Sequence, residues 1–192
     1  MDTKSKFVPW NFDAPKGMRE AIVSTYVPRS EDGTDKRYQK EFSALRSRAV
    51  PEHTKIADVE ALAEAFRQAG VTVRSVQTAY EFNGQNTGNY WVIVLKAERY
   101  DYQTAFYISE LGKFIACDLI WQDGCHDGPH KHFENLSGES LKTIALCRAI
   151  AETSGYDWLD ADLLYQTVPG LFVWFYGVGE QSVRDLLFYW VD

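Results

Sequence analysis

Four β-rich segments follow one another between residues 71 and 121, and they limit the possible folds more than any other feature of the chain. They are VTVRSVQTAYEF (71–82), YWVIVLKA (90–97), TAFYIS (104–109) and FIACDLIW (114–121). Alternating polarity and β-branched or aromatic residues are typical of strands, and the short link ELGK (110–113) predicts a hairpin. Because strands joined by short links pair as antiparallel neighbours, the region predicts an antiparallel meander.

Segments with helical periodicity flank these strands. TKIADVEALAEAFRQAG (54–70) predicts a helix that is capped by Thr54 and ends at Gly70. A second helix is expected from Glu139 to Ser154, with Cys147 in the core and Gly155 as its stop. Its expected apolar stripe is Leu141, Ile144, Ala145 and Ala151.

The C-terminal third adds a short helix within YDWLDADLLYQ (156–166), a buried strand LFVWFY (171–176) and a final helix in EQSVRDLLFYWVD (180–192). The expected fold class is α+β. We expect one antiparallel sheet of about four to five strands in a meander, with helices packed on one face.

The composition changes near Pro51. Residues 1–55 contain eleven Lys and Arg against eight Asp and Glu, a net charge of +3, whereas residues 56–192 contain nine against nineteen, a net charge of −10. This difference predicts an N-terminal extension of residues 1–55 attached to an α+β core domain of residues 56–192.

The extension contains a pattern typical of a basic amphipathic helix, TDKRYQKEFSALRSRAV (34–50), with Thr34 or Asp35 as its cap. Two interpretations remain open: a helix docked by its apolar stripe with a solvated charged face, or a helix that binds a partner. The expected stripe is Tyr38, Phe42, Leu45 and Ala49.

The apolar content of the chain bears on its location. Residues 1–17 contain no apolar run of the length that a secretory signal needs, and the longest runs elsewhere are too short to span a bilayer. The three cysteines are odd in number and irregularly spaced, which argues against a disulfide framework. We therefore expect a soluble cytoplasmic protein that does not contact a membrane.

The segment CHDGPHKH (125–132) contains three of the four histidines and one of the three cysteines. Imidazole and thiolate are natural zinc ligands, so the segment predicts a possible tetrahedral zinc site formed by Cys125, His126, His130 and His132. Two other interpretations are a polar crossover from strand to helix and a metal-free site with Cys125 as nucleophile.

Two further segments have features of binding sites. FYGVGEQS (175–182) has the Gly-x-Gly of a phosphate-binding turn, but Ser182 replaces the third glycine of that fingerprint, so we interpret it as a tight turn.

The second segment is acidic, with carboxylates before and within the short helix expected at 156–166. Glu152, Asp157, Asp160 and Asp162 predict an acidic binding patch rather than a catalytic pair.

An acidic core domain repels phosphate, which argues against direct contact with nucleic acid. No strong catalytic signature is present, so we do not expect an enzyme. The function expected is a small acidic binding or inhibitor protein that docks on a basic protein partner. It is similar, in composition alone, to toxin-neutralising immunity proteins and phage-encoded inhibitors. The alternative is a small zinc-dependent enzyme or zinc-stabilised domain that uses the segment from Cys125 to His132.

Overall fold

The computed structural model describes residues 12–26, 38–83, 88–96, 102–121, 136–172 and 180–188. The chain forms two compact units, each made of segments that are distant in sequence. Unit 1 combines Met1–Pro51 with Asp162–Leu186, and unit 2 combines Glu52–Ala161 with Leu187–Asp192. The division into residues 1–55 and 56–192 stays a prediction. Across the described segments, no helix has the length and apolar character needed to cross a membrane.

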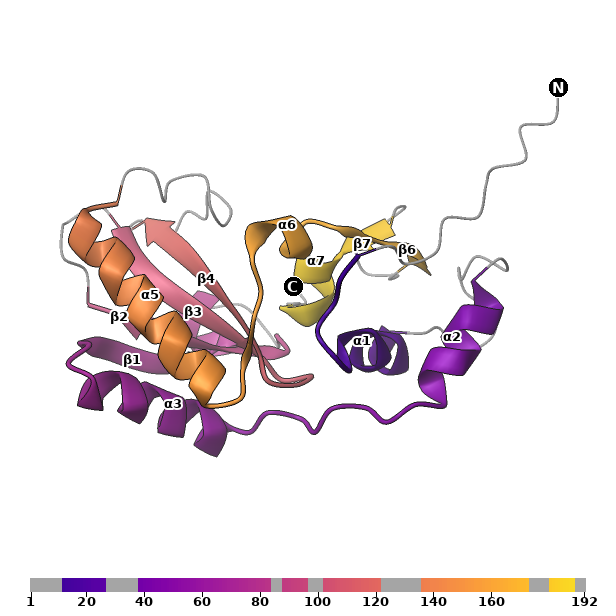
Figure 1. The fold of residues 1–192 in the computed structure, drawn as a ribbon, viewed down its shortest axis with the longest axis horizontal. Coiled ribbons are helices and arrows are strands. Elements are labelled where there is room, and N and C mark those ends of the chain that lie inside the picture. The colour runs from indigo at the N-terminus through magenta and orange to yellow at the C-terminus, as the bar shows by residue number, and fades with distance from the viewer. Residues whose placement is uncertain are drawn as a thin grey trace, which may run out of the picture. The chain divides into compact units, whose positions relative to one another are not determined.

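Unit 2 contains a five-stranded sheet in the order β1-β2-β3-β4-β5. Figure 1 labels the strands from β1 to β4. The strands are β1 (Val73–Thr78), β2 (Tyr90–Leu95), β3 (Tyr102–Ser109), β4 (Phe114–Trp121) and β5 (Asp157–Trp158). The first four pair antiparallel, and β5 pairs parallel to β4. The predicted meander and the α+β class are therefore confirmed.

Helices α3 (Ile56–Gln68) and α5 (Gly138–Thr153) pack on one face of this sheet (Figure 1). Successive side chains of a strand point to opposite faces, so alternate residues of β2, β3 and β4 meet the helices. Phe66 of α3 packs edge-on against Phe106 of β3, with 5.4 Å between ring centroids. Burying such apolar surface is the main stabilising contribution to a fold of this kind.

Helix α3 ends as expected but begins one residue later than predicted. Gly70 follows it with a φ of +86°, a conformation that glycine adopts without strain. Lys55 rather than Thr54 is the N-cap, and its backbone N–H donates to Asp58 Oδ2 at 2.9 Å. The Asp58 carboxylate thus satisfies a backbone donor near the start of the helix.

Helix α5 spans nearly the predicted residues, but half of its predicted stripe was wrong. Cys147 and Ala151 are fully buried, whereas Leu141 is 44% exposed and Ala145 is also exposed. The reason is that apolar residues occur on all sides of this helix, so their spacing alone does not identify the buried face.

The opposite face of the sheet also carries buried side chains. Tyr107 of β3 contacts the rings of Tyr90, Phe82 and Phe188, at centroid distances of 5.4, 6.0 and 6.2 Å. Phe82 lies on α4 (Ala79–Asn83), where the sequence predicted a continuing strand. Local capping explains the difference, because the carboxylate of Glu81 accepts the N–H of Thr78 at 2.8 Å and favours a helical turn.

Unit 1 contains α1 (Met18–Tyr26), α2 (Gln39–Arg46), and a two-stranded antiparallel sheet of β6 (Thr167–Phe172) and β7 (Glu180–Ser182). The sequence predicted one final helix over 180–192. Among the described residues, that region is instead β7 followed by α7 (Val183–Leu187). The predicted burial of Tyr38, Phe42 and Leu45 is confirmed, whereas Ala49 lies beyond the end of α2 and is exposed.

The two sequence segments of unit 1 meet at Gly170 and Tyr38. Gly170 in β6 has a φ of +76°, and a Cβ atom at this position would overlap the ring of Tyr38. Tyr38 in turn stacks on Phe42, with ring centroids 6.0 Å apart. Glycine is therefore required here both by backbone conformation and by close approach of a side chain.

Candidate functional site

The predicted zinc ligands lie outside the described residues, since Cys125, His126, His130 and His132 all fall within 122–135. The zinc site therefore stays a prediction. In the portion of the chain that the structure does describe, no group of three or more His, Cys, Asp and Glu side chains could hold a metal ion.

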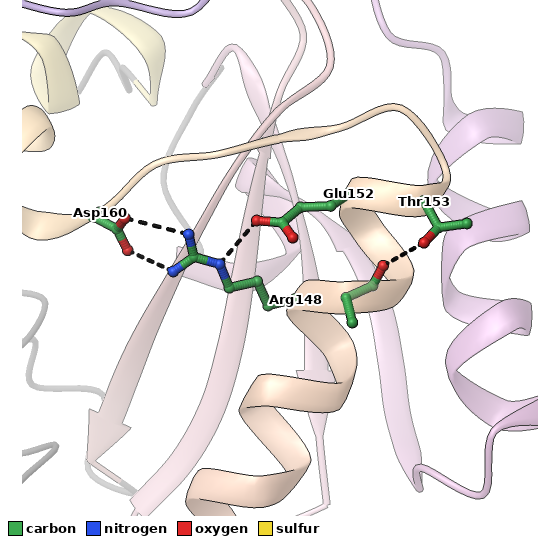
Figure 2. A network of polar contacts seen from close by, with 5 residues as sticks. Arg148, Glu152, Thr153 and Asp160 are labelled. Atoms are coloured by element: carbon green, nitrogen blue, oxygen red, sulfur yellow. Dashed lines mark hydrogen bonds and ion pairs between the residues drawn. The ribbon is translucent and has the colours of Figure 1, made fainter.

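Arg148 is the centre of a polar network at the C-terminal end of α5 (Figure 2). Its Nε donates to Glu152 Oε1 at 2.9 Å, and its two terminal nitrogens donate to the carboxylate of Asp160 at 2.9 and 3.4 Å. Arg148 and Glu152 are four residues apart on the helix, which places them on the same face. The fork of the guanidinium fits the paired oxygens of a carboxylate, so Asp160 binds it in a bidentate manner.

An aromatic ring completes this network. The guanidinium carbon of Arg148 lies 5.5 Å from the ring centroid of Trp158, within the range of a cation–π interaction. Trp158 itself packs edge-on against Phe106 at 5.9 Å, which fixes the ring in the sheet. The hydrogen bond to Glu152 and the charge of Asp160 hold the pKa of Arg148 above its ordinary value.

Asp157 precedes Trp158 in β5, so the short helix predicted within residues 156–166 was wrong at this position. Its backbone N–H donates to the carbonyl of Lys113 at 2.8 Å, so pairing with the sheet edge determines its conformation. Partial desolvation raises the pKa of its carboxyl group. Among the residues that the structure describes, no cation pairs with Asp157.

The structure therefore joins two of the four predicted patch residues, Glu152 and Asp160, through Arg148. Asp157 lies in the same unit, whereas Asp162 is the first residue of the C-terminal segment of unit 1 and lies in the first turn of α6 (Ala161–Leu164). Sequence reasoning missed Arg148. The signal available was its spacing of four residues from Glu152, which is typical of a helical ion pair.

The negative charge of the chain is concentrated in the unit that contains this network. Unit 2 has nine Lys and Arg against seventeen Asp and Glu, a net charge of −8, whereas unit 1 has eleven against ten, a net charge of +1. A surface with such an excess of one sign attracts oppositely charged molecules over a range limited by ionic strength.

Glu110, in the turn between β3 and β4, is a second titratable group in an unusual environment. Its carbonyl accepts the N–H of Thr54 at 3.1 Å, which brings residues 53–54 against the turn. Burial raises the pKa of the Glu110 carboxyl, and the nearby charge of His53 partly opposes this shift. A perturbed carboxyl is a feature of many functional sites, but structural positions show it as well.

The two described cysteines are unsuited to nucleophilic chemistry. Cys117 on β4 and Cys147 on α5 are free and buried in the core between sheet and helices. Burial raises the pKa of Cys147 to about 12 and that of Cys117 well above its ordinary value. Because the thiolate is the reactive form, neither group is a nucleophile at neutral pH.

Comparison of the chain with protein-family models, with curated proteins and with solved structures finds no match. A functional conclusion therefore rests on the charge distribution of the two units and on the Arg148 network.

Proposed function

We propose that the chain is a binding or inhibitor protein that docks on a basic protein partner through the acidic surface of unit 2. The observation that carries this proposal is the concentration of charge, −8 in unit 2 against +1 in unit 1. Complementary charge accelerates association and favours basic partners over acidic ones.

The Arg148 network supports a partner that presents arginine. Two carboxylates bind the guanidinium of Arg148 at hydrogen-bond distances of 2.9 to 3.4 Å, and its central carbon lies 5.5 Å from the centroid of an indole ring. An arginine side chain of a partner would find the same bidentate acceptor and aromatic face. A lysine ammonium cannot use this planar arrangement equally well.

Arg148 also competes for this surface. In the free protein it neutralises Glu152 and Asp160. Asp157, which precedes Trp158 in β5, has no ion pair among the described residues. We therefore expect Asp157 to contribute to binding of a cation. Removal of the Arg148 charge is expected to strengthen binding, because it releases two carboxylates.

The test uses labelled hexa-arginine and hexalysine peptides as probes, with binding measured by fluorescence anisotropy at about 0.05 M and about 0.5 M salt. Asp157→Asn is expected to weaken binding of hexa-arginine by about 1.5- to 5-fold, the effect of one exposed ion pair. Arg148→Gln is expected to strengthen it by a similar factor, and both effects should diminish at the higher salt concentration.

Glu64→Gln on α3 is the matched control, since it removes one exposed carboxylate of unit 2 that pairs with Arg67 and takes no part in the Arg148 network. Equal effects of Glu64→Gln and Asp157→Asn would indicate attraction by total charge and contradict a defined surface. Binding that is indifferent to salt, or equally strong for both peptides, would contradict arginine recognition by charge.

A further inference from the structure

We draw no further inference here: the strongest candidate, the exposed apolar face of α5 formed by Leu141, Ala145 and Leu146, carries nothing because no described part of the structure shows what covers it.

Discussion

Replacing Gly170 with alanine is expected to destabilise unit 1 by about 2 to 5 kcal/mol. The position has two requirements that alanine does not meet. Its φ of +76° lies in the left-handed region, and a Cβ atom would overlap the ring of Tyr38. The substitution therefore tests whether residues 1–51 and 162–186 fold against each other.

The magnitude is the sum of these two effects. A side chain in the left-handed region costs about 1 to 2 kcal/mol. Forcing an extra methyl group into a packed position costs about 1 to 3 kcal/mol more. Gly155→Ala supplies the first effect alone, because Gly155 has a φ of +81° and no heavy atom of a described residue beyond its chain neighbours lies within 4 Å of the Cβ position.

The assay is urea unfolding followed by circular dichroism, applied to a double-mutant cycle of Gly170→Ala and Tyr38→Ala. With Tyr38 truncated, the methyl group has room, so Gly170→Ala is expected to cost only the conformational part, about 1 to 2 kcal/mol. The reasoning is refuted if Gly170→Ala costs the same in both backgrounds, or no more than Gly155→Ala does in the wild-type background.

Tyr156→Phe is expected to leave the free energy of unfolding unchanged or to raise it by up to about 1 kcal/mol, since the buried hydroxyl has no hydrogen-bond partner among the described residues. A clear decrease in the free energy of unfolding, measured with urea, would show that the hydroxyl does have a partner and would contradict this. The raised pKa of Glu110 means that the folded state binds its proton more tightly, so stability falls as pH rises through that pKa. Glu110→Gln should therefore raise the free energy of unfolding at neutral pH but not at a pH below the ordinary glutamate pKa. An equal effect at the two pH values would contradict this. The zinc interpretation predicts about one zinc per chain by elemental analysis, and this zinc should be absent from the double variant of His130→Ala and His132→Ala. Wild-type protein without bound zinc would contradict the zinc interpretation.

The sheet could be predicted from sequence because its signals are local. The strands at 90–95 and 114–121 are rich in β-branched and aromatic residues, and a four-residue link before the second defines a hairpin. The parallel pairing of β5 was missed, because Asp157 and Trp158 are too few to show a strand pattern. That strand depends on its pairing with β4, a contact between distant parts of the sequence.

The candidate site was predictable only in part. Composition identified the acidic residues, but the ion pair of Arg148 with Asp160 joins residues twelve positions apart across a turn and a strand. Such a contact depends on how the chain that follows α5 runs to the edge of the sheet. The spacing of residues within one element does not specify this path. The sequence also could not show that the unit boundary separates Asp160 from Asp162.

The assembly of unit 1 from two separated segments determines the order in which the chain can fold during synthesis. Residues 1–51 leave the ribosome first, but the segment Asp162–Leu186 follows only after the 110 residues from Glu52 to Ala161. At roughly 5 to 20 residues per second, that interval lasts about 6 to 22 seconds. Throughout this interval Tyr38, the N-cap residue of α2, has no Gly170 to pack against. Most of unit 2 is complete at the end of the interval, before the second segment of unit 1 has been made.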